Sequence, residues 1–133
     1  IHPGGKLGAA LKRVRDIMRV GQGDPLIAPE VKVPDAIAAI SAGGIGAVGV
    51  VEGGKLIGII TDGDLRRKLS PEAFTKTARE IMTANPKVIA PEAPVADAIA
   101  IMNERRITLL FAVEDGKPIG VVHMHDLLAA GVR

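Results

Sequence analysis

Apolar and polar positions along the chain predict a short series of alternating strands and helices. Residues 47–51 and 56–61 are mostly apolar runs joined by a Glu-Gly-Gly-Lys turn, which predicts a β-hairpin. Before the hairpin we expect a helix, because Pro34 suits a first helical turn and the apolar residues that follow it recur at helical spacing. A short strand at residues 26–28 precedes this helix, and a helix at residues 62–69 follows the hairpin. The predicted order is strand, helix, strand, strand, helix.

The same order of elements returns 62 residues later, with Gly120 in the place of Gly58. Ala28-Pro29-Glu30 recurs as Ala90-Pro91-Glu92, and the turn Glu52-Gly53-Gly54-Lys55 recurs as Glu114-Asp115-Gly116-Lys117. The second copy predicts strands at 88–90, 108–113 and 118–123 and helices at 95–104 and 126–130. Two similar halves most easily bury their apolar faces against each other around a pseudo-twofold axis. The expected fold class is therefore α+β, built from two β-α-β-β-α repeats.

The chain outside the two copies is short. Apolar residues at three- and four-residue spacing predict an amphipathic helix over residues 7–18, and the sequence begins at Ile1 rather than methionine. We therefore expect residues 1–15 to be a linker from a preceding domain. The first copy is assigned to residues 16–69, a connector to 70–79 and the second copy to 80–133.

Composition narrows the classes of function. The 133 residues are 47% hydrophobic, but Phe74 and Phe111 are the only aromatic residues, so stacking platforms for single-stranded nucleic acid are missing. The formal charge of +2 comes from interspersed charges, which does not imply a polyanionic partner. The sequence has no cysteine and no apolar run near 18 residues. We expect a cytoplasmic protein that binds neither nucleic acid nor membranes.

The junction at residues 58–67 carries the candidate chemistry. A buried strand runs directly into a helix there, and Asp62, Gly63 and Asp64 are expected to cap that helix. The helix N-terminus and two arginines, Arg66 and Arg67, predicted in its first turn, would suit a phosphate or carboxylate. Thr61 and Asp64 would bring a hydroxyl and a carboxylate to one small space, where they could bind sugar hydroxyls. A self-capped helix with solvated arginines is the alternative.

The repeat resembles a CBS motif, a unit that works in tandem pairs. Its signature of glycine, two apolar residues, threonine or serine, two variable residues and an acid is matched by Gly58, Ile59, Ile60, Thr61 and Asp64. The resemblance implies a nucleotide bound in a cleft between two motifs, with Thr61 and Asp64 on the ribose and first-strand residues near the base.

The second copy departs from this signature, because His123 replaces the threonine while Gly120 and Asp126 are kept. Leu128 and Ala129 also stand where the first copy has its two arginines, so we expect one good site rather than two. The residues expected to line the ligand sites are Leu26, Ile27, Thr61, Asp62, Gly63, Asp64, Arg66, Arg67, Val88, Ile89, Thr108, His123, His125 and Asp126.

His123, His125 and Asp126 also suggest a metal site, since an H-x-H on an extended strand places both rings on one face. A metal needs three or four convergent ligands, so we expect none here. The alternative is that one histidine lines the nucleotide site and the other caps the last helix.

Three stretches are similar to the arabinose-5-phosphate isomerases of the KdsD/KpsF type. They are His2-Pro3-Gly4-Gly5 with Leu7-Gly8, residues 61–67 and residues 123–132. This resemblance implies an N-terminal sugar-isomerase domain outside the given sequence, which would interconvert ribulose 5-phosphate and arabinose 5-phosphate for the synthesis of Kdo and lipopolysaccharide. His2 would belong to that active site only with the missing domain, and we expect no catalysis from these 133 residues.

Two functions remain open. A regulatory module would sense a nucleotide or nucleotide sugar and bias the attached isomerase, with CMP-Kdo as a feedback ligand and AMP or ATP as the alternative. A structural module would only hold isomerase domains together. In both cases we expect a homodimer of the pair and a higher oligomer of the full-length protein.

Overall fold

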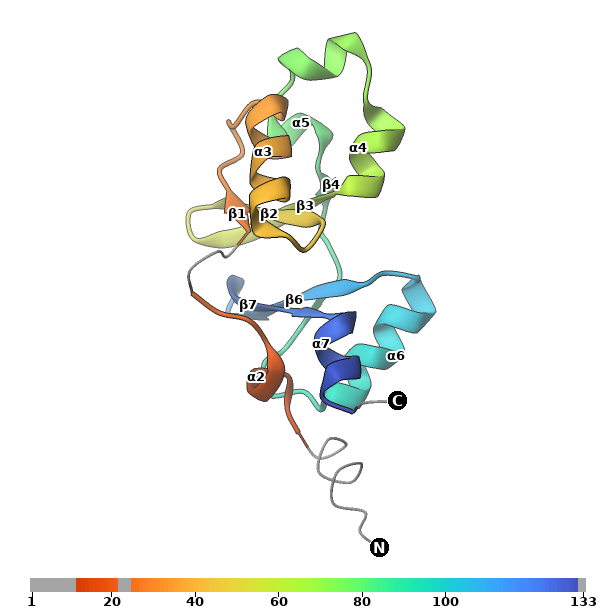
Figure 1. Cartoon of the computed structure of the whole chain (residues 1–133). Helices are drawn as coiled ribbons and strands as arrows, with labels where there is room; N and C mark the ends of the chain where they lie inside the picture. Colours follow the sequence, from red (N-terminus) through yellow and green to blue (C-terminus); the bar gives the residue numbers. More distant parts are fainter. Residues whose placement is uncertain (1–11, 22–24, 132–133) are drawn as a thin grey trace, which may run out of the picture. The chain divides into compact units, whose positions relative to one another are not determined.

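The computed structural model of the chain describes residues 12–21 and 25–131 (Figure 1). Within these residues the chain forms two compact units, and each contains one of the predicted repeats. Gln22–Pro86 makes the first-repeat unit, and Ile1–Gly21 together with Lys87–Arg133 makes the second-repeat unit. The predicted order of strand, helix, strand, strand and helix is confirmed in both.

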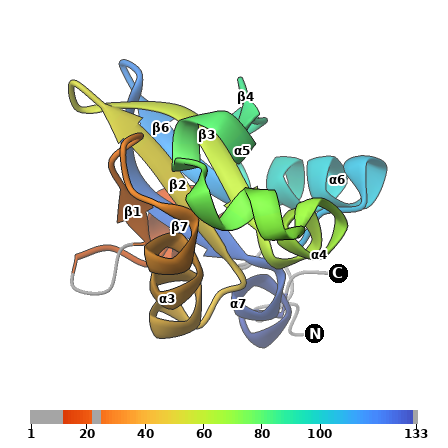
Figure 2. The same ribbon diagram turned by 90° about the horizontal axis from the view of Figure 1, so that it is seen from above.

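The first-repeat unit is built on a four-stranded sheet of order β1-β2-β3-β4. Strand β1 is parallel to β2, and the other pairs are antiparallel. The turn between β2 and β3 lies at one end of β3, and α4 begins at the other end (Figure 2). The elements are β1 (Leu26–Ile27), α3 (Val33–Gly43), β2 (Ala47–Glu52), β3 (Lys55–Thr61), α4 (Asp62–Lys68), η1 (Pro71–Thr75), α5 (Ala78–Ile81) and β4 (Thr83–Ala84).

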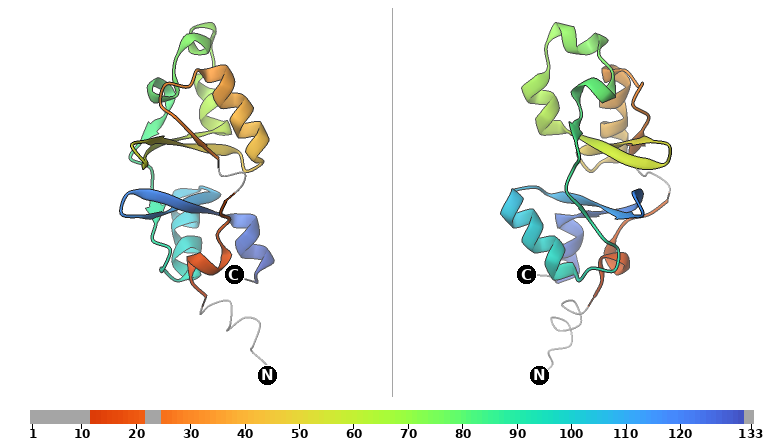
Figure 3. Two further views of the ribbon diagram at one scale, coloured as in Figure 1. Left: turned by 90° about the vertical axis from the view of Figure 1, so that its left-hand side faces the viewer. Right: turned by 180° about the vertical axis from the view of Figure 1, so that it is seen from behind.

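The second-repeat unit repeats this arrangement on a three-stranded sheet of order β5-β6-β7. Its hairpin has the register of the first, since Leu109 pairs with His123 as Ala47 pairs with Thr61. In each unit the helices cover one face of the sheet (Figure 3). The elements are α2 (Val14–Ile17), β5 (Val88–Ile89), α6 (Val95–Arg105), β6 (Leu109–Glu114), β7 (Lys117–His123) and α7 (Met124–Ala129).

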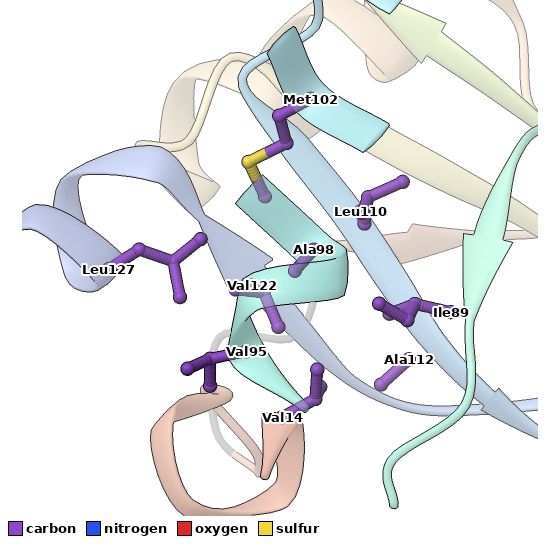
Figure 4. Close-up of a cluster of buried hydrophobic side chains, with 9 residues drawn as sticks. All are labelled: Val14, Ile89, Val95, Ala98, Met102, Leu110, Ala112, Val122 and Leu127. Atoms are coloured by element: carbon purple, nitrogen blue, oxygen red, sulfur yellow. The ribbon is translucent and has the colours of Figure 1, made fainter. Parts of the chain in front are cut away.

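Each unit has an aliphatic core of its own. The second-repeat core contains Val14, Ile89, Val95, Ala98, Met102, Leu110, Ala112, Val122 and Leu127, contributed by all six elements of the unit (Figure 4). The first-repeat core is centred on Val33, Ala36, Ile40, Val48, Val50, Ile60 and Leu65. Of the two aromatic residues, Phe111 is buried, whereas Phe74 in η1 is 46% exposed.

Helix α2 precedes the first repeat in the chain but completes the core of the second. Val14 is fully buried there, and its N–H donates to the Ala93 carbonyl at 2.8 Å. Helix α5 has the same place in the first-repeat unit, where the Ala78 N–H donates to the Val31 carbonyl at 2.7 Å. Each repeat therefore depends on a short helix that lies outside its own β-α-β-β-α run.

The helix predicted over residues 7–18 is shorter within the described residues, where it covers only Val14–Ile17. Its predicted apolar residues Leu7, Ala10 and Leu11 lie outside the described part. The connector predicted at 70–79 contains η1 and the start of α5. In the described part of the chain, no helix combines the length and the hydropathy needed to span a membrane.

Candidate functional site

Thr61 ends strand β3 and caps helix α4. Its Oγ1 accepts a hydrogen bond from the Asp64 N–H at 3.0 Å, and an Asp64 carboxylate oxygen accepts from the Thr61 N–H at 3.2 Å. This reciprocal pair is a capping box, in which each side chain satisfies a backbone donor that the helix leaves free. The prediction that Asp62 and Gly63 cap the helix is wrong, because both residues are already part of α4 and the N-cap is Thr61.

The two arginines lie at the far end of this helix. Helix α4 has only seven residues, so Arg66 and Arg67 fall in its last turn and not in its first, as the sequence analysis had placed them. Arg67 nevertheless reaches back along the helix, and its Nη2 donates to Asp64 Oδ1 at 2.5 Å. Arg67 remains 70% exposed at its side chain, whereas that of Asp64 is only 13% exposed.

Asp64 is therefore a shielded carboxylate with two partners. One oxygen accepts from the Thr61 N–H and the other from Arg67. A carboxylate has about four acceptor positions, so the remaining lone pairs can still accept from the hydroxyls of a ligand. Thr61 is half-buried, and its hydroxyl hydrogen is free to be donated while Oγ1 accepts from the helix.

The second repeat uses a histidine for the same capping task. Nδ1 of His123 accepts from the His125 N–H at 3.0 Å, which makes His123 the N-cap of α7. The expectation that both histidines lie on one strand face is wrong, because the chain turns into the helix at Met124 and His125 lies in its first turn. The two ring centroids are still 4.6 Å apart. Burial, and next the neighbouring His125, lower the pKa of His123 below its usual value.

Asp126 is held by an arginine from the other end of the chain. Nε of Arg19 donates to one carboxylate oxygen at 2.8 Å and Nη2 to the other at 3.0 Å, which is a bidentate ion pair. This hydrogen bonding lowers the pKa of Asp126. No repeat pattern in the sequence marks Arg19, because the residue that corresponds to it in the first repeat is Thr83, the first residue of β4.

The remaining candidates divide between the two units. Leu26 and Ile27 are half-buried in β1, on the far side of β2 from β3. Val88 is half-buried in β5, whereas Ile89 is 5% exposed and belongs to the hydrophobic core. Thr108 is exposed, and its carbonyl accepts from the Met124 N–H at 2.7 Å, beside the start of α7.

Two further predictions concern His2 and a metal site. His2 lies outside the described residues. Over residues 12–21 and 25–131, no three side chains of metal-binding type converge on one point. The polar candidates thus form two sets: Thr61 and Asp64 with Arg67 in one unit, and His123 and Asp126 with Arg19 in the other.

Comparison with protein families identifies two copies of one domain. The family described as CBS domain matches residues 14–71 and 78–133. Its two matches coincide closely with the two repeats found in the sequence.

Among proteins of known name, arabinose 5-phosphate isomerase KdsD of Pseudomonas aeruginosa is 40% identical over 136 aligned residues. The match covers 98% of this chain but only 42% of that protein. The chain thus spans less than half the length of this relative.

Two solved structures share the fold and hold nucleotides or nucleosides. The CBSX2 protein in complex with AMP has a TM-score of 0.79 and 25% identity, over 90% of this chain and 95% of its own. The CBS domain pair of MJ0100, in complex with 5-methylthioadenosine and S-adenosyl-L-methionine, has a TM-score of 0.78 and 27% identity, over 90% and 94%. All three ligands contain adenosine or a derivative of it.

Proposed function

Since the chain belongs to the CBS domain family, we propose that it is a regulatory module that senses a nucleotide and so biases an attached enzyme. A ligand shifts such an equilibrium only as far as it binds one arrangement better than the other. The observation that carries the proposal is the Thr61–Asp64 pair, which offers a hydroxyl and a shielded carboxylate at the end of strand β3.

In this proposal the ribose hydroxyls donate to the free lone pairs of Asp64, beside Thr61. Hydrogen bonds to a charged acceptor are the stronger kind, and a carboxylate that is 13% exposed loses little solvation when the ligand binds. Leu26 and Ile27 would flank the base with apolar surface. Asp126 would offer the same carboxylate chemistry in the second repeat, with His123 in place of the threonine.

We propose an adenine nucleotide as the ligand, because two similar CBS structures hold adenine compounds. CMP-Kdo is the second candidate, and the similarity to KdsD favours it. CMP-Kdo needs cationic partners for its sugar carboxylate as well as an acceptor for its ribose. The position of Arg66 and Arg67 in the last turn of α4 weakens this candidate, since one of them is already paired with Asp64.

The parent protein, in our proposal, is a cytoplasmic arabinose-5-phosphate isomerase that supplies Kdo for lipopolysaccharide. The match to KdsD along nearly the whole of this chain supports it. The isomerase reaction would then take place in a domain outside these residues, and the present chain would bind a nucleotide without catalysing a reaction.

The alternative is a module that only joins isomerase domains. In either case we further propose that the chain forms homodimers. A monomer mass in light scattering at high protein concentration would contradict the dimer.

Calorimetry on the 133-residue chain tests the ligand. We expect AMP or ATP to bind and Asp64→Ala to weaken binding roughly ten- to a hundredfold, the loss of one hydrogen bond to a charged group. Arg67→Met is the matched control, because it removes the partner of Asp64 but keeps the carboxylate. If CMP-Kdo binds and the adenine nucleotides do not, CMP-Kdo becomes the favoured ligand. If no nucleotide gives a binding heat, the module that only joins isomerase domains is favoured.

A further inference from the structure

The two repeats hold their signature acid in different ways. Asp64 pairs with Arg67, which lies three residues further along the same helix. Ala129 stands at the place of Arg67 in the second repeat, so α7 cannot make this contact. Asp126 pairs instead with Arg19, which lies 107 residues away in the segment that leads into the first repeat. One acid is thus anchored within its helix and the other to a distant part of the chain.

Arg19 belongs to a segment that is joined to β7 by its backbone. Its N–H donates to the Val121 carbonyl at 2.8 Å, and its carbonyl accepts from the Val121 N–H at 3.0 Å. The neighbouring Met18 packs against Gly120 of the same strand. The Arg19 side chain then crosses to Asp126 at the start of α7, so one residue connects the segment to both the strand and the helix.

We infer that Arg19 is a positioning residue that couples occupancy of the second-repeat site to the segment around α2. This inference rests on the proposed function, because it takes Asp126 to be a ligand-binding carboxylate. Arg19 forms a bidentate pair with the two oxygens of Asp126, whereas Arg67 donates to one oxygen of Asp64. Lone pairs remain on both acids, but a ribose that approaches both oxygens of Asp126 along the bidentate edge has to displace the guanidinium. Ligand binding would loosen the ion pair and with it the contact between this segment and β7.

The ion pair between Arg19 and Asp126 can be broken by a bound ligand. The Arg19 side chain is 50% exposed and that of Asp126 23%, so water screens the pair on the arginine side, although its bidentate geometry makes it stronger than a single surface contact. A ligand can therefore displace Arg19 without unfolding the unit. In the first repeat Asp64 is bonded only within the β3–α4 junction, to the Thr61 N–H and to Arg67, so a ligand there has no ion pair to the α5 segment to release. Ligand binding at the second-repeat site would consequently affect the segment around α2, whereas binding at the first-repeat site would affect only the β3–α4 junction.

Hydrogen exchange on the full 133-residue chain, with AMP as the probe, tests this coupling. The backbone N–H groups of Arg19 and Val121 are the reporters, and the Ala78 N–H in the equivalent α5 segment is the internal control. We expect AMP to speed exchange at both reporters in the wild type. Arg19→Met should abolish this response, because the ion pair is already absent, and should tighten AMP binding roughly two- to fivefold, as expected for an exposed ion pair. The matched variant Arg67→Met should keep the response.

The outcomes separate the inference from the proposed function. If AMP binds but neither reporter responds, or if Arg19→Met and Arg67→Met behave alike, the coupling is refuted and nucleotide sensing stands. Weaker AMP binding in Arg19→Met would also refute the competition, since Arg19 would then contact the ligand. No binding of AMP to the wild-type chain would overturn this inference, and no binding of any nucleotide would overturn the proposed function with it.

Discussion

Met18 lies so close to Gly120 that a Cβ atom on this glycine would stand 2.7 Å from the Met18 sulfur and 3.0 Å from the Arg19 carbonyl oxygen. Met82 covers Gly58 in the first repeat in the same way, with its Cγ 2.8 Å from the position of such a Cβ atom. The glycine that opens each signature is therefore explained by packing. It leaves room for the methionine that follows the short helix of each unit as its C-cap.

We expect Gly58→Ala and Gly120→Ala each to lower the free energy of unfolding by about 1–3 kcal/mol, the usual effect of an added carbon in a packed interior. Gly120→Ala should be the more harmful, because one of its neighbours is a backbone oxygen that cannot rotate away. Denaturant unfolding measures both.

A double-mutant cycle checks the cause of this loss. Gly58→Ala should destabilise the Met82→Ala protein less than the wild type, since all three atoms nearest to the added carbon belong to Met82. Equal losses in both backgrounds would show that the contact with Met82 is not the cause.

Thr61→Ala should destabilise the chain by about 0.5–2 kcal/mol through the loss of a helix N-cap. Thr61→Ser keeps the hydroxyl that accepts from the Asp64 N–H and should remain close to wild type. Thermal unfolding without ligand measures both variants. If Thr61→Ser is as unstable as Thr61→Ala, the threonine methyl group and not the cap is responsible.

His123 should make the stability of the chain depend on pH near neutrality. Its folded-state pKa lies below the value of 6.5 that it has in the unfolded chain, because burial disfavours the charged ring. As the pH falls, His123 therefore takes up its proton in the unfolded chain before it does so in the folded chain. Its contribution to the free energy of unfolding is complete above pH 6.5 and is lost as the pH falls through the folded-state pKa. Protonation also removes the lone pair on Nδ1 that accepts from the His125 N–H.

The test compares His123→Thr with the wild type by thermal unfolding between pH 7.5 and 5. Threonine caps the equivalent helix in the first repeat, so the variant should fold and should lose less stability on acidification. An identical pH dependence in the two proteins would assign the effect to other groups.

Asp126 should contribute to stability at a lower pH. Its pKa is depressed below 3.8 in the folded state by the hydrogen bonds from Arg19, so this contribution is complete above pH 3.8 and is lost as the pH falls through the folded pKa. Arg19→Met should flatten the pH dependence of unfolding in this acidic range. Because Arg19 is half exposed and solvent screens the pair, we expect a small change and no effect near neutral pH. A steeper acid dependence in the variant would contradict this assignment.

The sequence predicts the order of elements because the hydrophobic pattern of each element lies within a few neighbouring residues, and the duplication shows that pattern twice. Thr61 and Asp64 are found from their spacing, and their capping contact follows from the three-residue step. Arg19 cannot be found in this way, because its partner Asp126 is 107 residues distant and the other repeat has no counterpart. The misplacement of Arg67 has another cause, because the predicted helix starts at the observed residue. Asp62, Gly63 and Asp64 are interpreted from the sequence as capping residues, although they form the first turn of α4 and leave Arg67 in the last.

The place of α2 has a consequence for synthesis on the ribosome. Val14 leaves the exit tunnel before any part of the first repeat, yet its partners in the core include Val95 and Leu127, near the other end of the chain. The first-repeat unit is contiguous and can fold as soon as Pro86 has emerged. At about 5–20 residues per second, α2 then waits on the order of ten seconds for its partners. Throughout that interval the nascent chain carries an amphipathic segment with an uncovered apolar face, and a chaperone that binds short apolar stretches would find it there.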